Sequence, residues 1–505
     1  MTGSYQLEPY TWDNLVTLFS FVPNIDRGDY VSGKPQIAYL DYYCEKAGVQ
    51  SLILVAPYVD RHYSEDYWGY YVKCHSEYPK TCARLHFFKA AIDPSAVEAF
   101  LKNGEGLDFN DFGYCGFVVV KPLPETVVGR TCLTPLPVVD GGTSAGSFFL
   151  TRSGYRPHLF GVDLRVSALP FQEQDHEVGA CATSAMWTAL HGTANAFGTP
   201  ILSPLQITQR AAAKRPVLSV SLPSDGLTLE QLASVFRDVG LEADHISAEQ
   251  KYVLQSASAA YLRAHIPVIL TFRFETSELH GVTLTGIGPM DGPLTPLSET
   301  GFLLRATRIQ RIYAHDDGVG PYSDLTIDAK SKHVITSWLD ENGNREKAAA
   351  DVLLVPLSHT LRVQFPEILA AVQDFDWVVE QSKHKYKRSL FERPEWDIFL
   401  STACDFKKSI LMHNGITKSD RKKMLMQGFP HFIWRAIAYA DGSPAFEMLF
   451  DSSDLRQGRQ LITTLIYNLK FSAKLGTLCK RALYLRNSVS ALTHTMLREM
   501  STISK

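Results

Sequence analysis

The sequence predicts a mixed α+β protein with three domains. Its 505 residues correspond to about three domains of ~100–200 residues each. The apolar share of 45% and the charged share of 20% are those of a globular chain, which excludes the collagen-like, low-complexity and mainly disordered classes. In the middle third of the chain, helical patterns come first and strand patterns follow, an order that is typical of α+β proteins.

The first block, 1–160, is predicted to be an α/β domain, with α+β as the alternative that strands separated by helices leave open. Apolar, strand-like runs lie at 51–57 and 115–121, and segments suited to helices separate them. The glycine- and serine-rich stretch 140–147 is a natural border to the next block. The sequence assigns no role to this domain.

The central block, 161–360, is predicted to begin with helices and continue with strands. One helix should start near Gly179 and another after Ser203. A third starts at Thr228, a suitable N-cap with Gln231 three positions later. A fourth helix is expected at 249–264, and strands at 267–272, 280–286 and 310–316.

The third block, 361–505, is predicted to be mostly helical and basic. Apolar residues recur at helical spacing between Leu461 and Leu469. The block holds 22 Lys and Arg against 14 Asp and Glu, whereas the whole chain holds 50 against 53. We expect this basic surface to bind a protein partner or the acidic blocks of the chain itself. The basic runs at 383–388 and 421–423 come without a nucleic-acid motif, so nucleic-acid binding is not expected.

The chain is expected to be cytoplasmic and reduced. Its eight cysteines are scattered and do not form the spacing of a disulfide framework. No apolar run approaches the ~18 residues of a membrane span. The first residues lack the basic and then apolar pattern of a secretory signal.

Cys181 is the strongest candidate for a nucleophile. It lies in the expected first turn of the helix that begins near Gly179, between the small residues Ala180 and Ala182. The positive end of the helix dipole favours the thiolate form at this place. A thiolate becomes a catalytic nucleophile when an imidazole can reach it and a third group holds that imidazole.

The chain has suitable partners on both sides of Cys181. His280 begins a predicted strand 99 residues downstream, and Asp316 ends the next strand, 36 residues further on. Gln174 lies seven positions before Cys181, where its amide could join the Cys181 N–H in an oxyanion hole. The alternatives that the spacing leaves open are Asp317 for the acid and Gln172 for the amide.

These motifs resemble the papain-like cysteine peptidase superfamily, and within it the bacteriocin-processing (double-glycine) peptidases. The shared pattern is a Gln before a Cys at a helix start, the strand Pro-Val-Ile-Leu, then His-Gly-Val-Thr-Leu-Thr-Gly and Tyr-x-x-Asp. The resemblance is confined to 161–360 and implies a papain-like domain. We expect no cofactor and no metal, because the sequence shows no P-loop, no dinucleotide fingerprint and no usual zinc spacing. It implies Cys181 as nucleophile, His280 as general base and acid, Asp316 as the residue that orients His280, and Gln174 as oxyanion donor. The family usually places its Gln six residues before the Cys, one position closer than here.

The reaction that this set implies is acyl transfer through a thioester. A peptidase or an isopeptidase is the expected activity, with a peptide or protein as substrate. Transglutaminase-type and arylamine acetyltransferase-type folds share the Cys-His-Asp order, so an acyltransferase stays open. The alternative from another class is a non-catalytic papain-like scaffold that binds a protein partner.

Residues 142–146 match the G-x-S-x-G pattern of serine hydrolases. That pattern requires a strand before the serine and a helix after it. The residues that follow Gly146 do not form a convincing helical pattern. We therefore expect a linker here.

A cluster of cysteine and histidine in the first block has the residue types of a zinc site. Its members are Cys74, His75, Cys82 and His86. Their spacing matches none of the usual zinc frames, and aromatic neighbours surround them. A packed core is the expectation.

Overall fold

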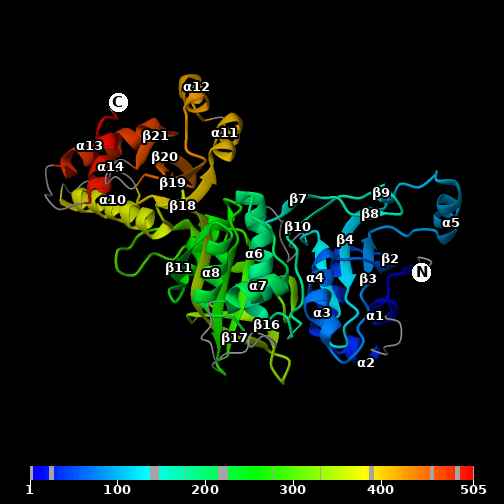
Figure 1. Ribbon diagram of the computed structural model, residues 1–505. Helices are drawn as coiled ribbons and strands as arrows, with labels where there is room; N and C mark the ends of the chain where they lie inside the picture. Colours follow the sequence, from blue (N-terminus) through cyan, green and yellow to red (C-terminus); the bar gives the residue numbers. More distant parts are fainter. Residues whose placement is uncertain are drawn as a thin grey trace. The chain divides into compact units, whose positions relative to one another are not determined.

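The computed structural model (Figure 1) forms two compact units. It describes residues 4–21, 28–136, 147–175, 177–213, 226–276, 278–329, 331–385, 392–413, 415–454, 460–483 and 490–503. The first unit comprises 1–246, 265–287 and 311–356, and the second comprises 247–264, 288–310 and 357–505. The expected boundary at 360 lies next to a change of unit. The expected boundary at 160 lies inside the first unit, and two segments of the central block belong to the second unit.

A five-stranded sheet forms the N-terminal part of the first unit. Its strands are β1 (Ser4–Pro9), β2 (Ser51–Tyr58), β3 (Cys82–Phe88), β4 (Tyr114–Val120) and β5 (Val128–Leu133), paired in that order. All four pairings are antiparallel, so the expected α/β domain is wrong and this part is α+β as well. The connections are hairpins or short helices on the sheet faces, and these return the chain antiparallel to the preceding strand.

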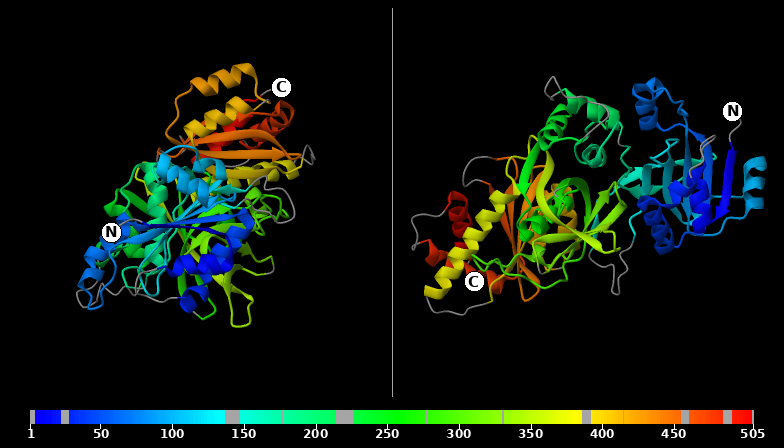
Figure 2. Two further views of the ribbon diagram at one scale, coloured as in Figure 1. Left: turned by 90° about the vertical axis from the view of Figure 1, so that its right-hand side faces the viewer. Right: turned by 90° about the horizontal axis from the view of Figure 1, so that it is seen from below.

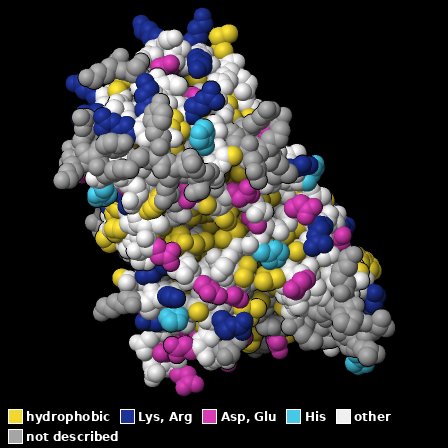
Figure 3. All heavy atoms as spheres, turned by 90° about the vertical axis from the view of Figure 1, so that its left-hand side faces the viewer, with side chains coloured by type: hydrophobic (Ala, Val, Ile, Leu, Met, Phe, Trp, Pro, Cys, Tyr) yellow, Lys and Arg dark blue, Asp and Glu magenta, His cyan; other side chains and the backbone are white. Residues whose placement is uncertain are grey.

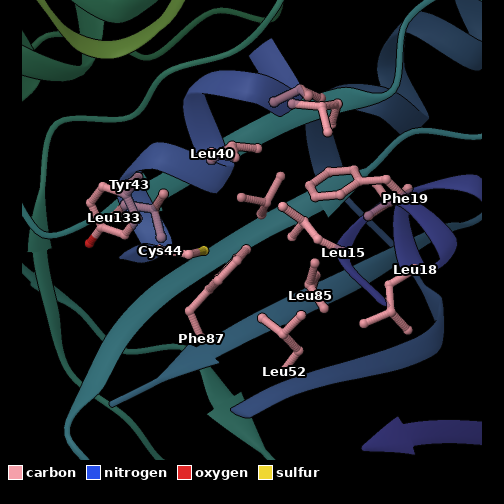
Figure 4. Close-up of a cluster of buried hydrophobic side chains, with 14 of the residues drawn as sticks. Leu15, Leu18, Phe19, Leu40, Tyr43, Cys44, Leu52, Leu85, Phe87 and Leu133 are labelled. Carbon is pink, nitrogen blue, oxygen red and sulfur yellow. The ribbon is translucent and has the colours of Figure 1, made fainter. Parts of the chain in front are cut away.

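Helices cover both faces of this sheet (Figure 2). The helices are α1 (Trp12–Ser20), α2 (Gly28–Ser32), α3 (Pro35–Ala47), α4 (Arg61–Gly69) and α5 (Pro94–Asn103), with 3₁₀ turns at Tyr71–Lys73 and Phe109–Phe112. Leu52 and Leu54 pack against α1 and α3, as Figure 4 shows for Leu52, whereas Ile53 packs on the opposite face with α5. This alternation follows from the two-residue period of a strand.

Six further strands of the first unit pair in a closed ring. They are β12 (Val268–Phe274), β13 (Leu279–Ile287), β14 (Arg311–Asp316), β15 (Gly320–Ile327), β16 (His333–Leu339) and β17 (Arg345–Ser358). Each is antiparallel to the next, and β17 pairs with both β16 and β12. Strands β11 (Leu241–Ser247) and β6 (Phe148–Phe149) add to β17 and β13. Short strands β7 (Arg152–Tyr155), β8 (His158–Leu159), β9 (Val162–Asp163) and β10 (Val166–Ala168) form two separate ribbons.

Helix α6 (Cys181–Phe197) packs on this ring. Its apolar residues form one buried cluster with those of α7 (Pro204–Ala212) and α8 (Leu229–Asp238). The Thr283 hydroxyl of β13 donates to the carbonyl of Ala185 at 2.6 Å, which ties the helix to the strand. The helices and strands expected for the central block are present within a few residues of their predicted bounds.

The predicted cap of α8 is present as a reciprocal pair. The Thr228 hydroxyl accepts from the Gln231 N–H at 3.3 Å, and the Gln231 side chain accepts from the Thr228 N–H at 2.9 Å. We expect Thr228→Ala to lower the free energy of unfolding by about 1 kcal/mol in urea denaturation. Thr228→Ser keeps the acceptor oxygen and should stay close to wild type. An equal loss in both variants would contradict this role.

The second unit is built on a four-stranded antiparallel sheet. Its strands are β18 (Glu395–Thr402), β19 (Phe432–Ala440), β20 (Ser443–Asp451) and β21 (Leu461–Ile466). Its helices are α9 (Lys251–Leu262), α10 (Phe365–Lys385), α11 (Ala403–Met412), α12 (Lys418–Met426), α13 (Leu469–Ala482) and α14 (Ala491–Ser501), with a 3₁₀ turn at Arg305–Arg308. Phe406 of α11 and Met424 of α12 pack on one sheet face, and Phe471 of α13 stacks on Phe446 on the other.

The expectation of a mostly helical third block therefore needs correction. The apolar residues from Leu461 to Ile466, which recur at helical spacing, form a strand, and the helix begins only at Leu469. Four of these six residues are β-branched, which favours a strand, and β20 offers an unpaired edge. A short apolar run cannot be assigned by periodicity alone.

Candidate active site

Cys181 is the first residue of α6, as expected. The N-cap residue Ala180 has no side chain that could cap the helix, so the amides of the first turn keep their polarity toward the thiol. The thiol is free and partly exposed, whereas Cys44, Cys82, Cys115, Cys132 and Cys479 are buried. Cys181 is therefore both reachable and placed at the positive end of a helix.

The structure brings His280 and Asp316 to this thiol. They lie on neighbouring antiparallel strands, β13 and β14. The distance from His280 Nε2 to Asp316 Oδ1 is 3.0 Å, and Cys181 is among the groups that raise the pKa of the same imidazole. The backbones beside the two residues are close, since a Cβ on Gly281 would lie 4.0 Å from the Ala182 Cα. Three side chains that are far apart in the sequence thus meet at one site, with the imidazole and the carboxylate in hydrogen-bond contact.

Asp316 is held by N–H donors on both of its oxygens. Its Oδ1 accepts from the Gly318 N–H at 3.1 Å, and its Oδ2 accepts from Trp338 Nε1 at 2.9 Å. The Trp338 ring also meets the His280 ring edge to face, with centroids 5.2 Å apart. Trp338 therefore orients the acid and packs against the base, a role that sequence reasoning missed because a lone Trp in a strand carries no spacing signal.

The electrostatics of His280 favour the imidazolium. Burial of the ring opposes the charged form, but the Asp316 carboxylate, the hydrogen bonds to Asp316 and Cys181, and the nearby Asp317 together raise the pKa of His280 well above its usual range. A charged imidazole beside a thiol stabilises the thiolate, because the two opposite charges attract.

Asp317, the alternative acid, has a different environment. Its Oδ1 lies 3.6 Å from His280 Nε2, beyond hydrogen-bond range, and its buried Oδ2 has no hydrogen-bond partner in the described chain. Burial raises the pKa of Asp317 to about 7, with attraction to His280 opposing the shift and Asp316 adding to it. The geometry thus favours Asp316 as the residue that orients His280.

The shifted pKa of Asp317 predicts a pH-dependent stability. Its folded value of about 7 lies above the ordinary 3.8. As the pH rises from 4 to 7, Asp317 therefore loses its proton in the unfolded chain before it does so in the folded chain. This difference lowers the free energy of unfolding of the wild type. Asp317→Asn cannot ionise, so its stability relative to wild type should increase over this range by at least about 1.4 kcal/mol, one pKa unit. Urea denaturation at both pH values measures it, with exposed Asp163→Asn as control, and a constant difference would contradict the prediction.

The two candidate oxyanion donors differ in burial. Gln174 lies in the extended segment before α6 and is partly exposed, and only its backbone carbonyl is engaged in the described residues, by the Thr126 hydroxyl at 3.4 Å. Gln172 is buried, with 5% of its surface exposed. An oxyanion donor must reach an open cleft, so Gln174 suits the role better.

Residues of the N-terminal block support the site, which the sequence did not indicate. Gln36 of α3 donates from Nε2 to the Asp317 carbonyl at 2.7 Å. Lys34 forms an ion pair of 2.5 Å with Glu173, next to Gln174, and both side chains are buried. The Tyr71 hydroxyl donates to Asp175 Oδ2 at 2.9 Å, and Asp175 in turn accepts from the N–H groups of Val178 and Gly179, just before α6. The first block thus anchors the turn that carries the acids and the segment that leads to Cys181.

The other sequence patterns lead to no site. Cys82 and His86 are buried as expected for a packed core, and both ring nitrogens of His86 are engaged, by Tyr114 and by Arg84. That expectation is wrong for His75, which is exposed, and Cys74 is partly exposed. The G-x-S-x-G pattern at 142–146 lies outside the described residues. In the described chain, the one group with metal-ligand geometry is His280, Asp316 and Asp317. Both carboxylate oxygens of Asp316 already accept hydrogen bonds from N–H groups, so this group of three residues is poorly suited to bind a metal ion.

Comparisons with known proteins do not name a family. Neither a scan against protein-family models nor a search of curated proteins found a match to this chain. The helices of the described residues were also compared with the requirements of a membrane span, and none is both long and apolar enough.

Proposed function

We propose that this chain is a cysteine-dependent hydrolase that cleaves a peptide or isopeptide bond through a thioester. The observation that supports it is an imidazole, His280, that lies 3.0 Å from Asp316 and whose raised pKa has Cys181 among its causes. A nucleophile, a general base and an orienting group in hydrogen-bond reach are what such catalysis requires. A helix with Cys packed on an antiparallel sheet with His and Asp is also the arrangement that the resemblance to papain-like peptidases implies.

The chemistry follows from these contacts. The Cys181 thiolate attacks the carbonyl carbon, and the resulting oxyanion accepts hydrogen bonds from the Cys181 N–H and the Gln174 amide. The C–N bond breaks as the His280 imidazolium gives its proton to the leaving nitrogen. His280, now neutral, takes a proton from water, and the hydroxide attacks the thioester carbonyl. The carboxylic acid product leaves as the C–S bond breaks and the Cys181 thiolate is regenerated. His280, again protonated, then pairs with this thiolate.

Selective alkylation tests the proposal. Iodoacetamide reacts with thiolates, and an ordinary cysteine is ionised to less than ~1% at pH 6. Cys404 is exposed and therefore serves as the internal reference. We expect Cys181 to be alkylated at least about tenfold faster than Cys404 at pH 6, measured by peptide mass spectrometry, with a smaller ratio at pH 8.

The alternatives give distinct results. Equal rates at Cys181 and Cys404 at both pH values would favour the non-catalytic scaffold. Internally quenched peptides with and without an added amine separate the two enzymatic readings. Release of free acid indicates a hydrolase, and an amide of the added amine indicates an acyltransferase.

A protein partner for the basic C-terminal block is part of the same proposal. Lys and Arg side chains are exposed on the face that Figure 3 shows, and helix α12 carries Lys418, Arg421, Lys422 and Lys423. Lys418, Lys422 and Lys423 are exposed. Such a helix attracts an acidic surface over about 10 Å at moderate salt.

A further inference from the structure

The first unit contains a large cavity beside the candidate active site. Its volume is about 960 Å³, and it lies between α3 and strands β14, β15 and β16. This volume is in the range of small-molecule sites, ~300–1,000 Å³. Cys181, His280 and Asp316 are not among its lining residues, so it is separate from the sulfur and the imidazole.

The cavity walls are mainly aromatic. They include Tyr39, Tyr42, Phe149, Tyr313, Tyr322 and Trp338. Two glycines make room for two of these rings. A Cβ on Gly318 would come within 2.1 Å of the Trp338 ring, and one on Gly320 within 2.4 Å of the Tyr39 ring. Flat rings around such a volume suit a ligand with an aromatic or aliphatic body.

The charged groups of the lining indicate an anionic ligand. Three cationic side chains, Lys46, Arg311 and Arg345, line the cavity together with one carboxylate, Asp324. Asp324 is paired with Arg345 at 3.0 Å, so the lining carries an excess of positive charge. Lys46 is exposed, and its Nζ lies 5.6 Å from the centroid of the Tyr42 ring. A cation beside an aromatic wall can pair with a carboxylate, sulfonate or phosphate group.

Two parts of the cavity wall also hold the Asp316 carboxylate of the candidate triad. Trp338 lines the cavity with its ring and donates from Nε1 to Asp316 Oδ2 at 2.9 Å. Gly318 and Val319 line the cavity from the turn that follows Asp316, and the Gly318 N–H binds Asp316 Oδ1 at 3.1 Å. The cavity wall and the two donors that hold Asp316 are therefore the same groups.

We infer that this cavity binds an amphipathic anion, a molecule with an aromatic or aliphatic body and one acidic group, and that its occupancy alters the reactivity of Cys181 through Trp338 and Asp316. The binding half is independent of catalysis. The coupling half rests on the proposed function, because it requires a reactive Cys181.

A matched pair of dyes tests the binding half. 8-Anilinonaphthalene-1-sulfonate carries a sulfonate, and N-phenyl-1-naphthylamine has the same rings without it. We expect saturable binding of the sulfonate by the full-length chain at one site, at least about tenfold tighter than that of the neutral dye, because a charge-assisted contact forms. Fluorescence titration measures both affinities.

Three variants locate the dye. Ala38 is exposed and lines the cavity, so Ala38→Trp fills the mouth and should abolish binding. Lys46→Gln should weaken the sulfonate about five- to tenfold and leave the neutral dye unchanged. Lys102→Gln removes an exposed lysine on α5 and should change neither. Equal affinities for the two dyes, or full binding by Ala38→Trp with unchanged melting temperature, would overturn the site.

Alkylation of Cys181 tests the coupling half. Saturating sulfonate dye should change the iodoacetamide rate of Cys181 at least twofold and leave the rate of Cys404 unchanged. Trp338→Phe keeps an aromatic wall but loses the N–H to Asp316, so it should bind the dye while the Cys181 rate no longer responds. A dye-bound wild type with an unchanged Cys181 rate would overturn the coupling. A chain that binds the dye but whose Cys181 reacts no faster than Cys404 would keep the site and refute the proposed function.

Discussion

Replacing His280 with Ala is expected to reduce the rate at which a vinyl-sulfone probe labels Cys181 by ~10²–10⁴-fold at pH 7. The imidazole has two functions in this reaction. Its charge favours the thiolate, and its proton is needed when the vinyl carbon accepts the sulfur. Both contributions of the imidazole are lost in the variant. Peptide mass spectrometry of the labelled chain measures the rate.

Two controls separate chemistry from folding. His245→Ala removes an exposed histidine of β11 and should label at the wild-type rate. Added imidazole should restore part of the rate in His280→Ala, because it can enter the space left by the ring and supply the proton. A variant that labels within threefold of wild type would show that His280 does not activate the thiol.

Asp316→Asn is expected to lower the labelling rate by about 10–100-fold, although it is isosteric with the wild-type residue. Both carboxylate oxygens of Asp316 accept hydrogen bonds, from His280, from the Gly318 N–H and from Trp338. An amide has only one oxygen, so its NH₂ group must face one of these donors. The loss of negative charge also lowers the pKa of His280, since Asp316 is the strongest of the charges that raise it.

The neighbouring residue provides the matched control. Asp317→Asn removes the same charge one position further on, but Asp317 lies 3.6 Å from His280 Nε2 and its Oδ2 has no described partner. It should label within about threefold of wild type, because a carboxyl with a pKa of about 7 is only partly ionised at pH 7 and is the weakest of the groups that raise the pKa of His280. In Asp316→Asn the pH at which Cys181 is labelled fastest should be higher, because the thiolate then forms without a charged imidazole beside it. Equal losses in the two variants would make Asp317 the orienting acid instead.

Local sequence determined the elements that carry the candidate site. A cap such as Thr228 with Gln231, a proline at a helix start, and apolar runs of strand length act over a few residues, so they are visible in the chain alone. The helix that begins with Cys181 and the strands that carry His280 and Asp316 were predictable in this way. The convergence of the three residues was a prediction from spacing and resemblance, and the structure places His280 Nε2 3.0 Å from Asp316 Oδ1.

The tertiary structure decided what depends on partners that are distant in the chain. The choice of Asp316 over Asp317 rests on donors from β16 and from the following turn, and the support of Gln36 comes from 281 residues away. Leu461–Ile466 became a strand because β20 offered hydrogen bonds that its periodicity could not reveal. Local propensity is a property of neighbours along the chain, whereas a hydrogen-bond partner or an aromatic wall such as Trp338 exists only once the sheet has closed.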